Sequence, residues 1–151
     1  MTSAYRPEPS PFELAGLRAY RNMGIGMLIM DSEHVSLKDA TFSDNRRAIH
    51  VQRSESVSIS DTTIVGLSQE HRLLEATQSG APKLCPSRTT VVGGIEIPSY
   101  TPTRDGGGMM IENTSILGFS NLGCNNPYAF KINTEVSFPF AFANLRLMAP
   151  F

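Results

Sequence analysis

The chain has 151 residues, the size of one typical domain, and its 13 basic and 14 acidic side chains leave a net charge of −1. This balance excludes a generally basic nucleic-acid-binding protein and an acidic disordered tail. The longest run of apolar residues and glycine, Gly24 to Met30, has seven residues, whereas a membrane-spanning helix needs about 20. Two cysteines are too few for a disulfide-dense small scaffold. From the first residues we expect no secretory signal.

The beginning of the chain carries conflicting signals. Residues 1–11 are polar and proline-rich, and we interpret them as a flexible tail. Residues 10–13 (SPFE) read as a capping box with proline at the first helical position, which predicts a helix over residues 11–21. The same segment resembles residues 37–45 once a gap is allowed, which predicts a strand and a corner. We favour the strand.

An internal repeat dominates the middle of the chain. Residues 35–42 align without a gap on residues 57–64, 22 positions further on, and both copies read V-S-(L/I)-x-D-x-T-(F/I). A third copy follows, because residues 59–66 match residues 111–118. Apolar residues alternate within each copy, which predicts short strands, and the polar D-x-T or N-T-S segment is typical of a turn.

Short strands joined by corners and repeated every 22 residues indicate stacked coils, because one coil cannot bury its apolar face alone. We therefore predict an all-β fold over residues 12–151, a right-handed parallel β-helix (pectin-lyase-like solenoid) of about five coils. Two long loop insertions, residues 67–92 and 98–108, interrupt it, with a short strand at residues 93–97 between them. The apolar alternation returns from residue 128. The coils are expected to be part of a longer solenoid, whose neighbouring coils would be partners.

Asparagines mark the expected corners. Asn22, Asn45 and Asn113 occupy corner positions where stacked amide groups bond along the axis, and we expect an asparagine ladder. Asn113 also begins the N-glycosylation sequon Asn113-Thr114-Ser115. We favour the structural role, because a corner side chain that points inward cannot carry a glycan.

Several motifs, in a shared order, resemble those of a known family. They are LRAYRNMGIG at residues 17–26, VSL followed by FSDN within residues 35–45, GGMMIENTSI at residues 107–116, and AFKIN at residues 129–133. This order resembles the β-helix region of the cell-surface hyaluronidase, cell-migration-inducing hyaluronidase and fibrocystin-like family, whose ectodomains carry G8 domains.

The resemblance implies an extracellular or cell-surface glycoprotein that meets a polysaccharide such as hyaluronan. Two members of the family are associated with hyaluronan cleavage, whereas the fibrocystin-like members are surface receptors. None of the residues linked to cleavage matches a position in this chain. We therefore expect a non-catalytic ectodomain module, structural or glycan-binding, without cofactor or metal. The alternative is a fragment of a polysaccharide-degrading enzyme, a hydrolase or a lyase.

The densest polar cluster lies at residues 44–50. Arg46, Arg47 and His50 are the candidate glycan-contacting residues, because guanidinium groups bind a uronate carboxylate with two hydrogen bonds. A glycosidase would need two carboxylates about 5–10 Å apart. A lyase would need a base near the sugar and a cation on its carboxylate. The alternative reading is a solvated corner.

The histidines and cysteines are less informative. His34, His50 and His71 have a spacing that fits no metal motif, although the repeat period would let His50 and His71 approach each other. The extracellular setting implied by the resemblance favours a disulfide between Cys85 and Cys124. In a cytosolic setting these two would be free thiols.

The remaining motifs are assigned structural roles. Residues 104–108 (RDGGG) lack the Lys-Ser/Thr pair of a phosphate-binding loop and contain a tight turn. Met109, Met110 and the series Phe138, Phe140 and Phe142 are expected in the core. The alternative for the phenylalanines is a sugar-stacking platform on the surface.

Overall fold

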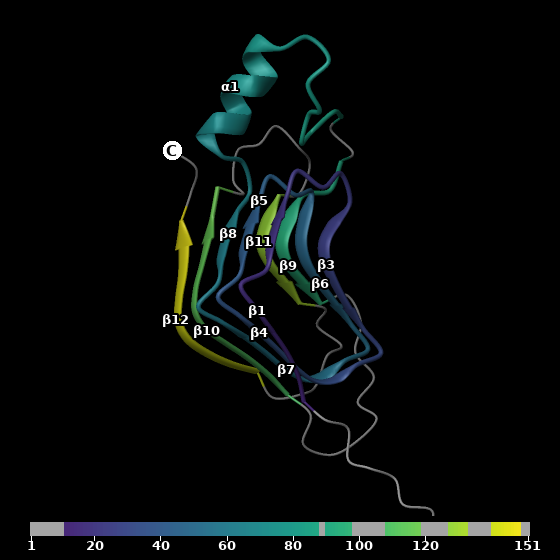
Figure 1. The fold of residues 1–151 in the computed structure, drawn as a ribbon, viewed down its shortest axis with the longest axis vertical. Helices are drawn as coiled ribbons and strands as arrows, with labels where there is room; N and C mark the ends of the chain where they lie inside the picture. The colour runs from purple at the N-terminus through teal and green to yellow at the C-terminus, as the bar shows by residue number, and fades with distance from the viewer. Residues whose placement is uncertain (1–10, 88–89, 98–107, 119–126, 133–139, 149–151) are drawn as a thin grey trace, which may run out of the picture.

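The computed structural model describes residues 11–87, 90–97, 108–118, 127–132 and 140–148, which form twelve strands and one helix (Figure 1). Every strand pair is parallel. Sheet A has the order β1-β4-β7-β10-β8-β5-β2, with β12 paired to β10, and sheet B has the order β11-β9-β6-β3. The strands of sheet A are β1 (Phe12–Ala15), β2 (Arg18–Tyr20), β4 (Glu33–Lys38), β5 (Thr41–Ser43), β7 (Glu55–Ser60), β8 (Thr63–Val65), β10 (Met109–Leu117) and β12 (Phe140–Met148). The strands of sheet B are β3 (Ile25–Met30), β6 (Arg47–Gln52), β9 (Gly93–Ile97) and β11 (Tyr128–Ile132).

The strand register confirms the sequence repeat. Val35 pairs with Val57, and Ile59 pairs with Ile111, as the alignment of the copies predicts. The conflict at the beginning of the chain is also resolved, because β1 and β2 are strands and Leu14 pairs with Leu37. The neighbouring strands supply hydrogen-bond partners for residues 12–20. A short helix would have to form all of its hydrogen bonds within itself, which is marginal at this length.

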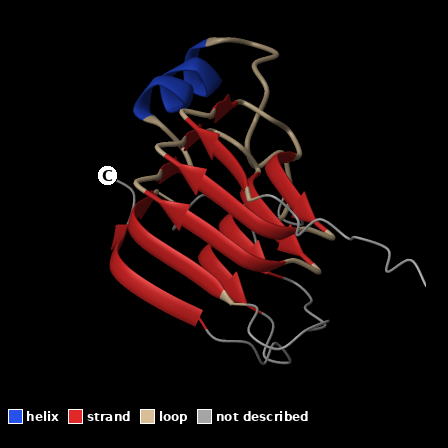
Figure 2. Cartoon of the chain, turned by 60° about the horizontal axis from the view of Figure 1, so that its bottom comes forward, coloured by secondary structure: helices blue, strands red, loops and turns tan. Residues whose placement is uncertain are grey.

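The predicted fold class is wrong. The described strands form two separate parallel sheets accompanied by a helix, and they do not close into a solenoid (Figure 2). The architecture is α/β-like, not an all-β right-handed parallel β-helix of about five coils. The 22-residue period determines which strands lie side by side. It does not determine whether the segments that join them complete a closed coil.

The first insertion is not a plain loop. It contains the helix α1 (Gln69–Thr77), which lies at one end of the sheets (Figure 1). Ser68 caps this helix by accepting a hydrogen bond from the His71 backbone N–H at 3.1 Å. The buried carboxylate of Asp44 accepts hydrogen bonds from the backbone N–H and the hydroxyl of Ser68, at 2.8 and 2.9 Å. The polar corner at Asp44 therefore fixes the start of the helix.

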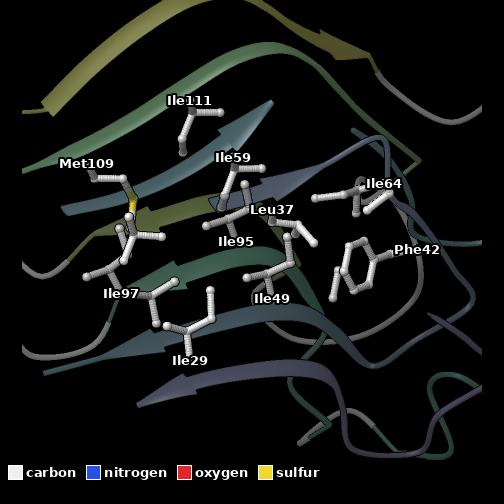
Figure 3. Close-up of a cluster of buried hydrophobic side chains, with 14 of the residues drawn as sticks. Ile29, Leu37, Phe42, Ile49, Ile59, Ile64, Ile95, Ile97, Met109 and Ile111 are labelled. Atoms are coloured by element: carbon white, nitrogen blue, oxygen red, sulfur yellow. The ribbon is translucent and has the colours of Figure 1, made fainter. Parts of the chain in front are cut away.

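The core lies between the two sheets. Leu37 and Ile59 from sheet A face Ile49 and Ile95 from sheet B, and all four are fully buried (Figure 3). Stacked repeats place an aliphatic side chain above an aliphatic side chain along each row, so the core continues from strand to strand. Full burial of one such side chain contributes about 1.5–3 kcal/mol.

Among the described residues, no helix is long and apolar enough to cross a membrane.

Several corners use left-handed backbone, and one row of them carries Asp and Asn residues. Asp39, Asp61, Asn113 and Asn144 have φ angles of 51°, 48°, 47° and 52°. Asp and Asn tolerate this conformation because their short polar side chains bond locally. The turn predicted from the D-x-T segments is confirmed, because Asp39 and Asp61 lie between two strands. The N-T-S segment lies inside the continuous strand β10, where only Asn113 adopts the left-handed conformation.

The expected asparagine ladder is only partly right. Asn22 Nδ2 donates to Asn45 Oδ1 at 2.7 Å, and Asn45 Nδ2 donates to the Ala19 carbonyl at 2.8 Å. Asn113 does not join them. It lies exposed in the other row of corners, where its Oδ1 accepts a hydrogen bond from Asn144 at 2.8 Å. Stacked amide pairs are therefore confirmed, but they lie in two separate rows of corners and do not form one ladder.

The expected core aromatics and methionines divide between the core and the surface. Met109 is buried, but Met110 is exposed and Phe142 is 46% exposed. The rings of Phe142 and Phe130 are almost perpendicular and form a T-shaped pair at a centroid distance of 5.5 Å. Phe138 and the side chain of Phe140 lie outside the described residues.

Candidate functional site

The outer face of sheet B carries a polar cluster. Ile49 and Ile95 point into the core, so their strand neighbours His50 and Glu96 point outward. His50 pairs in register with Glu96, which places the two side chains next to each other. Both side chains are about nine-tenths buried, with 11% and 10% exposure.

Glu96 is the centre of this cluster. Its Oε2 atom accepts a hydrogen bond from the Tyr128 hydroxyl at 2.6 Å. The same atom lies 3.5 Å from His50 Nδ1 and 3.8 Å from Arg47 Nε. A buried carboxylate needs such partners, because burial without them costs several kcal/mol.

Tyr128 is held as a hydrogen-bond donor. Burial, together with the hydrogen bond to Glu96 and the charge of Glu96, raises the pKa of Tyr128 well above its usual value of 10.0. The Lys131 ammonium lies 5.6 Å from the centre of the Tyr128 ring, within the range of a cation–π contact. Tyr128 therefore stays protonated near neutral pH.

A pocket of about 440 Å³ adjoins the cluster at Arg46 and Arg47. Its other lining residues are Met23, Gly24, Ile25, Thr90 and Val91. Arg46 Nε is buried, and no group in the described part of the chain forms a hydrogen bond with it. Arg47 is anchored by Glu96 and keeps 35% of its side chain exposed. Two guanidinium groups thus border one pocket.

The candidate residues from the sequence are only partly brought together. Arg46 and Arg47 line the pocket, whereas His50 lies against Glu96 and does not line it. His71 is buried in α1 and has other partners than His50, which lies beside Glu96. Its Nε2 atom lies 3.1 Å from the Pro82 carbonyl and 3.2 Å from Glu75 Oε1.

Sequence reasoning missed Glu96 and Tyr128. A signal for Glu96 exists, since it is the one charged residue of β9 and lies between Ile95 and Ile97 in a strand that is buried throughout. A charge in such a strand indicates a partner. Tyr128 is 32 residues away from Glu96 and has no comparable signal.

The structure describes one of the two cysteines. Cys85 is disulfide-bonded, and its predicted partner Cys124 lies outside the described residues. Within the described ranges, no group of three or more His, Cys, Asp or Glu side chains could hold a metal ion.

Comparisons with known protein families, curated proteins and solved structures find no match for this chain. The family resemblance of the sequence motifs therefore stays a prediction.

Proposed function

We propose that this chain is a non-catalytic, glycan-binding module of an extracellular or cell-surface protein, and that it holds an acidic polysaccharide such as hyaluronan. The observation that carries the proposal is the pocket bordered by Arg46 and Arg47. This pocket is within the usual size range of about 300–1,000 Å³ for small-ligand sites. It is large enough to receive part of a sugar unit.

The chemistry of the two arginines suits a uronate. A guanidinium group binds a carboxylate through two parallel hydrogen bonds, which a lysine cannot reproduce. Arg47 meets Glu96 through Nε, and its terminal nitrogens make no hydrogen bond among the described residues. Arg46 also lines the pocket, and its buried Nε has no hydrogen-bond partner among the described residues. A bound carboxylate would pair with terminal guanidinium nitrogens of Arg47 that have no hydrogen bond in the described part of the chain.

The geometry supports binding better than the alternative of a polysaccharide-degrading enzyme. A hydrolase needs a second carboxylate about 5–10 Å from the first. Glu96 is held by Arg47, His50 and Tyr128, so this carboxylate is engaged within the chain and is not free to act as one of such a pair. A lyase needs a base that can reach the substrate, but His50 is about nine-tenths buried and the pKa of Tyr128 is raised.

The test combines binding and cleavage in one sample. The purified chain is incubated with hyaluronan of defined length, and retention and chain length are both measured, with circular dichroism on the same sample. The variant Arg46→Gln/Arg47→Gln is compared with Arg18→Gln/Arg146→Gln, which removes the same charge from exposed positions of sheet A. We expect the first variant to weaken binding at least about tenfold, since charge-assisted hydrogen bonds contribute about 1.5–3 kcal/mol each. We expect the second to bind like the unmodified chain.

Three outcomes would contradict the proposal. A folded chain that retains no hyaluronan would leave a purely structural role. Equal loss in both double variants would mean that binding depends on net charge and not on the pocket. Shortened hyaluronan would favour the enzyme.

A further inference from the structure

The proposed binding site does not involve one motif of the sequence, the sequon Asn113-Thr114-Ser115. It is the one Asn-x-Ser/Thr triplet in the 151 residues. The expectation that Asn113 points inward is wrong, because its side chain is exposed at the corner of β10. The objection to a glycan at this position is thereby removed.

The local geometry presents the motif outward. β10 pairs in register with β12 on both sides of Asn113, but Asn113 itself is left out of the pairing. Thr114 is fully buried and its hydroxyl donates to the Glu112 carbonyl at 2.9 Å. Asn113 and Ser115, on either side of Thr114, are not buried. The two side chains that define the sequon therefore reach the surface.

The two polar atoms of the Asn113 amide have different surroundings. Its Oδ1 accepts the hydrogen bond from Asn144 Nδ2 at 2.8 Å. Its Nδ2, the atom that a glycan would modify, donates to no group among the described residues. A glycosylated asparagine keeps its amide oxygen, so the bond to Asn144 would survive the modification.

The disulfide gives a second, independent observation. Cys85 is disulfide-bonded, and disulfides are typical of proteins that fold in the secretory pathway and rare in cytosolic ones. N-glycosylation takes place on secretory proteins. The redox state of Cys85 and the exposure of Asn113 thus point to the same compartment.

We propose that Asn113 is an N-glycosylation site. The donor is a lipid-linked oligosaccharide with a diphosphate leaving group. A bond forms between Asn113 Nδ2 and the anomeric carbon of the first sugar, and the bond from that carbon to the phosphate oxygen breaks. The lipid diphosphate departs with the bonding electrons, and Nδ2 loses one proton to a base of the transferase. No oxidation or reduction takes place.

The glycan would not cover the proposed binding site. Asn113 lies in sheet A, between the parts of β10 that pair with β7 and with β8. Arg47 begins β6 of sheet B and Arg46 directly precedes it, and Figure 1 shows β10 and β6 on opposite sides of the molecule. The two features are therefore independent.

The test expresses the full chain behind a secretion leader in mammalian cells. Medium and whole-cell lysate are treated with peptide N-glycosidase F, which releases the glycan and converts the modified Asn to Asp. We expect one glycan, seen as a single downward shift on a gel, with the Asp at position 113 in the peptide mass spectrum. Asn113→Gln and Ser115→Ala should remove the shift, and Ser115→Thr should keep it.

Asn144→Gln is the matched control, because it removes the hydrogen-bond partner of Asn113 and leaves the sequon intact. This variant should still carry the glycan. The proposal is overturned if the unmodified chain shows no shift in either medium or lysate. It is equally overturned if the shift persists in Ser115→Ala.

Discussion

Tyr128 Oη and Glu96 Oε2 lie 2.6 Å apart, although the two residues belong to different strands and are 32 positions apart in the sequence. Gly93, the register partner of Tyr128, makes this contact possible. A Cβ atom on Gly93 would lie 2.0 Å from the Tyr128 ring, so the ring rests where a side chain would otherwise be. The glycine thus allows the tyrosine to cross the strand and reach the carboxylate that holds Arg47.

Tyr128→Phe should remove a donor from a buried carboxylate. We expect the free energy of unfolding at pH about 8 to fall by about 1–3 kcal/mol, measured by urea denaturation. Tyr20→Phe, at a position 65% exposed, is the control and should change little.

The same variant has a predictable pH dependence. The pKa of Tyr128 is raised in the folded chain, so its contribution to stability is complete below the unfolded value of about 10. This contribution is lost as the pH rises from about 10 toward the folded value, because the unfolded tyrosine then releases its proton more readily. The stability difference between the unmodified chain and Tyr128→Phe should narrow above pH about 10. A constant difference would contradict the burial of Tyr128 against Glu96.

Gly94→Ala tests the close approach of neighbouring strands in sheet B. A Cβ atom at this position would lie 2.3 Å from the Ala129 carbonyl oxygen, which belongs to the backbone and cannot move without distorting β11. We expect a loss of about 1–3 kcal/mol or more in the free energy of unfolding. Gly24→Ala is the control, since no atom lies within 4 Å of its added Cβ. Its effect should stay within about 0.5 kcal/mol. Equal effects would contradict the tight packing at Gly94.

Asn45→Ala should be far more costly than Asn22→Ala. Asn45 is 1% exposed, accepts hydrogen bonds from the backbone N–H and the side chain of Asn22, and donates to the Ala19 carbonyl. Its removal leaves these groups without a partner, and we expect a loss of about 2–3 kcal/mol by thermal or chemical denaturation. Asn22 is exposed, so water can replace it. Similar losses in the two variants would contradict the structural role of Asn45.

The pairing of strands could be predicted from the sequence, whereas the overall architecture could not. The match of Val35 with Val57 is a local pattern of apolar and turn residues, and lateral pairing follows directly from it. Closure of the chain around the core depends on the inserted segments, which have no repeat. The helix in residues 67–92 was missed because its signals are short: the cap Ser68 and the acidic Glu70 mark its start, and its last turn has no basic residue.

The candidate site shows the same division. Arg46 and Arg47 are adjacent in the sequence, so a cluster of positive charge could be predicted from them. Glu96 reaches Arg47 only through the register of β6 with β9, across the insertion that contains α1. No local pattern contains that pairing. For Asn113 the motif itself could be read from the sequence, but the direction of the side chain was predicted wrongly, because it is exposed.

Asp31 and Arg53 form an exposed ion pair at another corner, and it can be tested by titration. Arg53 donates to both carboxylate oxygens of Asp31, at 2.6 and 2.7 Å. These hydrogen bonds, aided by the charge of Arg53, hold the pKa of Asp31 below its usual value of 3.8. We expect Arg53→Gln to raise the pKa of Asp31 toward that value, measured by carboxyl ¹³C NMR. Since a lowered pKa stabilises the fold above the unfolded pKa, this contribution should disappear as the pH falls through the folded value. High salt should weaken the effect, because both groups face solvent. An Asp31 pKa that is the same in both proteins would show that the pair does not form in solution.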